Sequence, residues 1–148
     1  MTDRYRLSRR QLALPLIVLA QWCGTSLWFS INGVAASLHQ DLGLAEAALG
    51  QLTLAVQLGF IVGTLTIATT GLADRYRASR LFFAASLIGA GLNLAFIEYA
   101  DHPVLALVLR FLTGVSLAGI YPLGMKLVIG WTPNNTGAAL AWLVGMLT

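Results

Sequence analysis

Charged side chains are scarce in this sequence. Asp, Glu, Lys and Arg make up 10% of its 148 residues, whereas a typical soluble domain carries about 25%. Hydrophobic residues make up 57%, and the mean hydropathy is +0.77. So few charges cannot cover a water-facing surface of ordinary size. The composition therefore excludes a soluble globular domain and indicates an integral membrane protein.

Cysteine is almost absent. The single Cys23 excludes an internal disulfide and a Cys-rich metal site. The two histidines, His39 and His102, lie in separate predicted loops and do not make a metal pair. The sequence also has no nucleophile–base set and no phosphate-binding glycine loop. We therefore expect no catalytic residue, no metal, no cofactor and no nucleic-acid partner, so that the protein is not an enzyme.

Long uncharged runs are the main feature that is present. About 20 apolar residues in a helix cross the ~30 Å hydrocarbon core of a bilayer. Backbone polar groups in lipid must be satisfied within the span, so these runs should be helices. The predicted helices cover residues 12–34, 49–72, 81–97 and 104–125, and a fifth begins at 137. Because residues 137–148 rise only about 18 Å, we expect 1–148 to be a partial N-terminal transmembrane domain.

Prolines mark two helix features. Pro103 suits the first turn of the fourth helix, where its missing N–H costs nothing. Pro122 should kink that helix or end it one turn early. Asn135 or Thr136 is predicted to cap the fifth helix.

Lys and Arg are missing from the first and third predicted loops. Eight of the nine basic residues fall on one side of the predicted membrane, and the ninth, Arg110, is inside a span. Cationic residues stay on the cytoplasmic side, so this asymmetry predicts a multi-pass protein with a cytoplasmic N-terminus in the plasma (inner) membrane. The first apolar run exceeds the 7–15 residues of a signal peptide, so we expect no cleavage. The eight are Arg4, Arg6, Arg9, Arg10, Arg75, Arg77, Arg80 and Lys126.

Asp74 stands among the arginines of the stretch GLADRYRASR. A carboxylate at the C-terminal end of a helix meets the negative end of the helix dipole. We therefore expect a compensating partner, either an arginine or the positive N-terminus of another helix. Such a partner would hold the loop as a tight structural element.

This loop resembles the one between the second and third helices of the major facilitator superfamily. The family loop typically reads Gly-x-Leu-Ala-Asp-Arg-x-Gly-Arg-Arg, and residues 71–76 here read Gly-Leu-Ala-Asp-Arg-Tyr. The chain departs from it at Thr70 and at 77–79, where Arg, Ala and Ser replace Gly and two basic residues. The resemblance implies that Gly71, Asp74 and Arg75 form a conformational lock that braces one half of a transporter against the other.

A second resemblance concerns the fourth helix. Residues 110–114 read Arg-x-x-x-Gly, as that helix often does in the family, and 119–125 look like its cytoplasmic end. The resemblance implies an all-α integral membrane fold, with four helices and the start of a fifth from an N-terminal six-helix bundle. It implies a secondary transporter that moves a small-molecule substrate by alternating access, with the missing C-terminal helices completing the site. Protons are one option for the coupling ion.

Polar residues on the predicted helices leave their roles open. Gln21, Thr25 and Asn32 share one face of the first helix with Trp28. They either bond between helices or line a substrate cavity, while Trp28 is expected to pack. Arg110 lies about 10 Å inside the fourth span. It either snorkels to the headgroups or contacts an anionic substrate, a carboxylate of another helix or a water chain, with Tyr121 near it.

Small residues on the second helix predict a packing surface. Gly59 and Gly63 share a face, and small residues let helix backbones approach closely. Gly114 is expected to serve the same purpose on the fourth helix. Two other functions stay open: a small four-helix protein that acts as an oligomeric exporter or a non-catalytic assembly subunit, and a membrane-embedded enzyme. The first is opposed by the unfinished fifth helix, and the second by the lack of acids or histidines within the spans.

Overall fold

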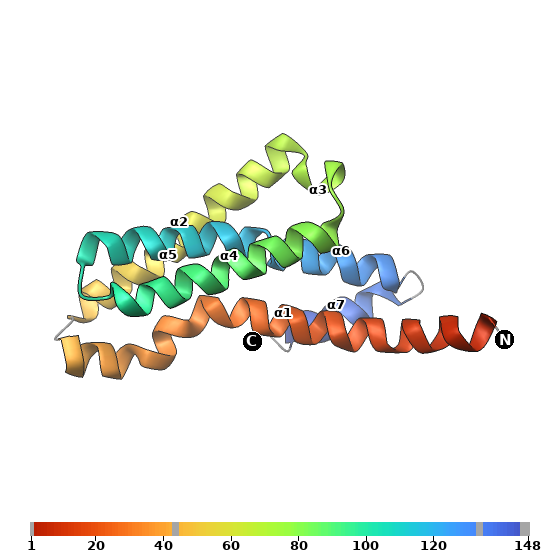
Figure 1. Cartoon of the computed structure of the whole chain (residues 1–148), viewed down its shortest axis with the longest axis horizontal. Helices are drawn as coiled ribbons and strands as arrows, with labels where there is room; N and C mark the ends of the chain where they lie inside the picture. Colours follow the sequence, from red (N-terminus) through yellow and green to blue (C-terminus); the bar gives the residue numbers. More distant parts are fainter. Residues whose placement is uncertain (1, 43–44, 133–134, 146–148) are drawn as a thin grey trace.

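All regular secondary structure in the described chain is α-helical. The computed structural model describes residues 2–42, 45–132 and 135–145, with side chains from residue 12 onward except at 41–42. No strand occurs in these ranges, which confirms the all-α prediction. The helices are α1 (Thr2–Leu42), α2 (Glu46–Thr70), α3 (Leu72–Arg75), α4 (Ala78–Glu98), α5 (Pro103–Ala118), α6 (Tyr121–Trp131) and α7 (Thr136–Gly145) (Figure 1).

Four helical segments of the described chain are long and apolar enough to cross a membrane. They cover Leu12–Gln40, Glu46–Thr70, Ala78–Glu98 and Pro103–Trp131, the last of which joins α5 to α6. Their outward faces carry large apolar side chains, such as Phe83, 64% exposed, and Ile97, 66% exposed. In a membrane protein such faces contact lipid or other membrane helices, so their exposure is expected.

The helices run further than the hydropathy pattern predicted: α2 and α4 each begin three residues early, at Glu46 and Ala78, and the first and fourth runs end later. The prediction ended the first run at residue 34 and the fourth at 125, whereas α1 reaches Leu42 and α6 reaches Trp131. A hydropathy argument finds where lipid contact ends, but a helix continues for as long as its backbone bonds are favourable. Residues 35–40 include alanine, leucine and glutamine, which favour a helix.

The fourth span breaks one turn before Pro122. The amide of Gly119 bonds to the carbonyl of Ser116 at 2.9 Å, and that of Ile120 bonds to the carbonyl of Leu117 at 3.0 Å. These tighter bonds end α5, and α6 then starts with the proline in its first turn. The proline has no N–H to donate, so the break falls where its missing donor costs least.

Glycines set the contact between α2 and α5. A Cβ added at Gly59 would lie 1.9 Å from the Phe111 carbonyl oxygen, and one added at Gly114 would lie 2.0 Å from the Val56 carbonyl oxygen. One added at Gly63 would lie 2.9 Å from a backbone oxygen of α5. The three glycines predicted at helix contacts therefore lie where two backbones touch. Beyond this contact, α2 leaves α5 toward α3 (Figure 1).

Gly71 turns the chain from α2 into α3. Its φ of 63° is the left-handed conformation that ends many helices, and its amide bonds to the Ile67 carbonyl. The single turn of α3 follows at once, and Arg77 then precedes α4. This compact connection carries Asp74 and the three arginines at one end of the molecule.

Candidate functional site

Arg110 is buried at the centre of the bundle. Within the described side chains it is the one charged residue in the buried set, with an exposed fraction of 0%. It lies two turns into α5, which packs against both α2 and α4. The whole side chain is buried and its guanidinium bonds inside the bundle, so it does not reach the headgroups. Snorkelling, one of the two roles considered from the sequence, is therefore absent in this structure.

The guanidinium of Arg110 binds two other helices. Its Nη1 donates to the Ser30 hydroxyl at 3.0 Å and to Asn93 Oδ1 at 3.2 Å. Its Nη2 donates to the carbonyl oxygen of Leu27 at 3.3 Å. The Ser30 hydroxyl also lies 2.9 Å from Asn93 Oδ1, so α1, α4 and α5 meet in one polar cluster. The ring of Phe96 adds a cation–π contact at 5.7 Å.

This polar cluster contains only neutral acceptors. No carboxylate of the described residues forms an ion pair with Arg110, and its buried Nε has no hydrogen-bond partner. A buried charge without a counter-ion is costly, and neutral dipoles offset only part of that cost. The cluster therefore presents positive potential inside an apolar bundle, where an anion is attracted more strongly than in water.

A cavity of about 440 Å³ adjoins the cluster between α1 and α4. Ser30, Asn93 and Phe96 line it at the end near Arg110, and Ile31 and Val34 line another part. Its volume lies in the range of small-ligand sites, which combine apolar walls with a few placed polar groups. The arrangement can receive an apolar ring and offer hydroxyl and amide groups to a polar substituent.

Gln21 and Tyr121 meet, but not at this cavity. Gln21 is 0% exposed, and its Nε2 donates to the backbone carbonyl of Tyr121 at 3.4 Å. Its Oε1 has no partner and lies against Gly124, where an added Cβ would sit 1.7 Å away. Gln21 therefore joins α1 to the start of α6, and Tyr121 takes part through its backbone oxygen.

The other residues of the predicted polar face separate. Thr25 is buried, and its hydroxyl donates to the Gln21 carbonyl of its own helix at 2.7 Å. Asn32 is exposed and does not line the cavity. Trp28 packs edge-on against Phe60 with ring centroids 5.0 Å apart. These side chains do not share one environment, because α1 contacts α6 near Gln21 and contacts α4 and α5 further along its length.

Ser30 and Asn93 were missed in the sequence reasoning. Asn93 is the only amide side chain in its predicted span, and an isolated polar residue in an apolar helix is itself a sign of a partner. Ser30 gives a weaker signal, since serine hydroxyls often bond to their own helix, as this one also does with the Leu27 carbonyl at 3.0 Å. The pairing of both with Arg110 follows from helix packing.

Asp74 has a partner of a different kind from those expected. Lys126 of α6 donates from Nζ to Asp74 Oδ1 and to the carbonyl oxygen of Ala73, both at 2.7 Å. The sequence suggested an arginine or a helix N-terminus. Lys126 takes this place because α6 continues past residue 125 and carries the lysine alongside α3. The hydrogen bond and then the charge of Lys126 lower the pKa of Asp74 below 3.8.

This ion pair is open to solvent, with side-chain exposures of 48% for Lys126 and 83% for Asp74. Its geometry links the loop between α2 and α4 to the end of the fourth span. Arg75 lies next to it and is exposed. An exposed pair contributes little stability, so its effect is on the position of the loop.

A hydrogen-bonded pair of side chains lies at the opposite end, in the loop before α5. Asp101 Oδ1 and His102 Nδ1 are 2.7 Å apart, and this hydrogen bond lowers the pKa of Asp101. Both side chains are exposed. Among the described residues no group of three His, Cys, Asp or Glu side chains is placed to hold a metal ion.

Known proteins resemble this chain in sequence. The 4-hydroxybenzoate transporter of Pseudomonas putida is 34% identical over 107 residues, which cover 72% of this chain and 23% of that protein. That of Pseudomonas aeruginosa is 33% identical over 107 residues, with the same two shares of 72% and 23%. The gallate transporter of Pseudomonas putida is 34% identical over 102 residues, covering 69% and 22%. No solved structure gives a significant match.

These matches span less than a quarter of the relatives' own length. The profile of the Major Facilitator Superfamily matches residues 17–148, which is nearly the whole chain. It includes all four candidate membrane spans from residue 17 onward, the loop with Asp74 and the buried Arg110. This is a family of transporters and not of enzymes, in agreement with the sequence. The chain is a multi-pass membrane protein that belongs to the Major Facilitator Superfamily.

Proposed function

We propose that the chain forms part of a secondary transporter for small aromatic carboxylates. The relatives are named as transporters of 4-hydroxybenzoate and gallate, which are both aromatic acids. A carboxylic acid is ionised at neutral pH, so such a substrate is an anion with an apolar ring. Family members bind their substrates near the middle of the bilayer and expose the site to each side in turn.

One observation carries this proposal: the buried guanidinium of Arg110 has no carboxylate partner in the described chain. The positive charge of Arg110, held by Ser30 and Asn93, attracts an anion from water. No carboxylate of the described chain is paired with it and would compete with that anion. The adjoining cavity, with Phe96 on its wall, suits an aromatic ring. Charge and ring recognition therefore lie side by side.

The proposed setting is the plasma (inner) membrane, with the N-terminus in the cytoplasm. This orientation puts three groups of basic residues on the cytoplasmic side: those before residue 12, those between α2 and α4, and Lys126. The coupling ion is proposed to be the proton. No described carboxylate forms an ion pair with Arg110, so the proposed proton carrier is the substrate itself or a residue outside the described ranges.

The loop lock is part of the same proposal. Asp74, Gly71 and Arg75 hold the connection between the second and third spans, and Lys126 fixes Asp74 to α6. A loop tied to the end of the fourth span moves with it as a rigid unit. Such a unit can brace against the missing helices of the same protein in one of the two states.

Uptake of labelled 4-hydroxybenzoate by cells that express the full-length gene product tests the substrate. We expect Arg110→Gln to abolish uptake and Arg110→Lys to retain part of it, because lysine keeps the charge but loses the planar fork. Ser26→Ala is the matched control, since Ser26 is exposed and bonds only within its own helix. A proton-gradient uncoupler should also stop uptake.

Competition separates charge from ring recognition. We expect unlabelled benzoate to compete with the labelled substrate and phenol, which has no carboxylate, to compete poorly. Equal competition by phenol, or full uptake by the Arg110→Gln variant, would contradict a role for the guanidinium in anion binding.

A further inference from the structure

An apolar groove runs between α2 and α4, at the end of the molecule where these helices diverge. Its volume is about 450 Å³, and α5 forms its floor. Small residues make room for it, among them Gly63 of α2, Ala84 of α4 and Gly119 at the end of α5. The groove is separate from the Arg110 cavity, which lies between α1 and α4.

The walls of this groove offer almost nothing for a polar ligand. Thr66 and Ser116 are its hydroxyl residues, and each hydroxyl donates to a carbonyl of its own helix, that of Val62 at 2.7 Å and that of Thr113 at 2.7 Å. The remaining lining is aliphatic or glycine. These walls fit an apolar occupant that lies along the groove.

The length of the groove matches one leaflet of a bilayer. Its lining on α4 extends from Leu81 to Leu92, and eleven residues of helix rise about 16 Å. This is about half of the ~30 Å hydrocarbon core. Leu81 follows the first turn of the helix, so the groove reaches from one membrane surface to the middle of the bilayer.

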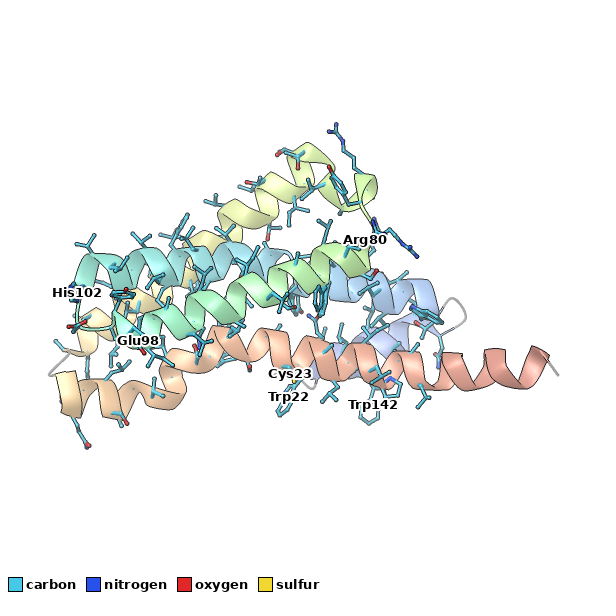
Figure 2. All side chains as sticks on the ribbon, viewed as in Figure 1. Trp22, Cys23, Arg80, Glu98, His102 and Trp142 are labelled. Carbon is cyan, nitrogen blue, oxygen red and sulfur yellow. The ribbon has the colours of Figure 1, made fainter. Side chains whose placement is uncertain are left out.

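Unneutralised positive charge stands at the surface end of the groove. Arg80 precedes Leu81, and Arg77 precedes α4, while Leu72 closes the groove from α3. Both arginines are exposed, and no described carboxylate forms an ion pair with them, because Asp74 is held by Lys126. Figure 2 shows Arg80 at the opposite end of the molecule from Glu98 and His102.

We propose that this groove binds one anionic phospholipid, with an acyl chain in the groove and the phosphate at Arg77 and Arg80. Arginine donates to phosphate with two parallel hydrogen bonds, and each basic residue near an anionic membrane surface strengthens attachment. The apolar groove fixes the position of the chain, and the two arginines select a negatively charged headgroup over a zwitterionic one.

The test is native mass spectrometry of the full-length gene product, purified with equal amounts of phosphatidylglycerol and phosphatidylethanolamine. We expect one phosphatidylglycerol to be retained in preference to phosphatidylethanolamine. Arg77→Gln with Arg80→Gln should weaken its binding about 30-fold, on the basis of roughly a fivefold effect for each basic residue. Replacing both with lysine keeps the charge and should preserve most of the binding.

A second pair of variants tests the groove. Ala84→Phe fills it and should expel the lipid, whereas Ala68→Phe places the same ring on an exposed position of α2 that does not line the groove. Equal retention of the two lipids by the unmodified protein would overturn the proposal. So would unchanged phosphatidylglycerol binding in the double glutamine variant, or a crosslink that puts another helix of the protein in the groove. Lipid retention is measured without transport, so its outcome is independent of the proposed substrate.

Discussion

Replacing Gly114 with alanine tests how the α2–α5 contact is held. The new Cβ would lie 2.0 Å from the Val56 carbonyl oxygen and 2.8 Å from the Phe60 amide nitrogen. Real Cβ contacts are not shorter than 3.0 Å, so the two backbones must separate by at least 1.0 Å at this point. Such overpacking costs about 1–3 kcal/mol, while alanine gains up to about 1 kcal/mol in helix propensity over glycine. With the full propensity gain, the net expectation is a destabilisation of up to about 2 kcal/mol, and with none it is up to about 3 kcal/mol.

Gly91→Ala is the matched control on α4. Its added Cβ would meet no atom within 4 Å, so only the propensity gain remains and the variant should be as stable as the parent or more stable. The measurement is thermal unfolding of the full-length gene product in mild detergent, monitored by circular dichroism. If Gly114→Ala is as stable as Gly91→Ala, the close approach of the two helices is not what holds this contact.

The remaining predictions concern charges, topology and polar contacts. Asp74→Asn should impair transport while membrane insertion stays intact, as uptake and accessibility labelling would report; unchanged uptake would refute the lock. Because Lys126 lowers the pKa of Asp74 below 3.8, the pair contributes at any pH above that value and is lost only as the pH falls through the folded pKa. The position of the loop should be salt-sensitive at pH 7, and it should lose that sensitivity only in acid, well below the ordinary pKa of an aspartate. Asn93→Leu should destabilise the protein by about 0.6 kcal/mol, the usual size of a polar contact between membrane helices, in detergent unfolding; a stabilised variant would contradict the guanidinium contact. Cysteines at Ser37 and Ser79 should label from opposite sides of the membrane, and labelling from a common side would refute the alternating topology.

The helical class and the four membrane spans were predictable from the composition and from the long apolar runs of the sequence. Long apolar runs that hold few charges and do not alternate with polar residues satisfy their backbone in lipid as helices. Pro103 also marked a helix start correctly, and Pro122 correctly marked an early end of the fourth helix, because a missing N–H acts locally. The helix ends at Leu42 and Trp131 were not predictable from hydropathy, since the backbone continues beyond the lipid contact.

The candidate site was predictable only in part. A charge within a span singles out Arg110 in the sequence, because burial of an arginine needs a reason. Its partners Ser30 and Asn93 lie 80 and 17 residues away, on helices whose rotation no local pattern reveals. Likewise, the charge of Asp74 predicted a positive partner, and in the fold that partner is Lys126, 52 residues away, and not one of the nearby arginines.

The amino-acid sequence by itself determined that this chain crosses a membrane as helices, and it predicts that the cations gather on one side. These properties follow from the transfer of side chains and backbone groups between water and lipid, which depends on local composition. Only the tertiary structure decided which side of α1 meets which helix, that the guanidinium rests on neutral acceptors, and that a groove opens below the arginines of α4. Those outcomes depend on how the packed helices are rotated and how they cross. Glycine contacts between distant segments fix this geometry.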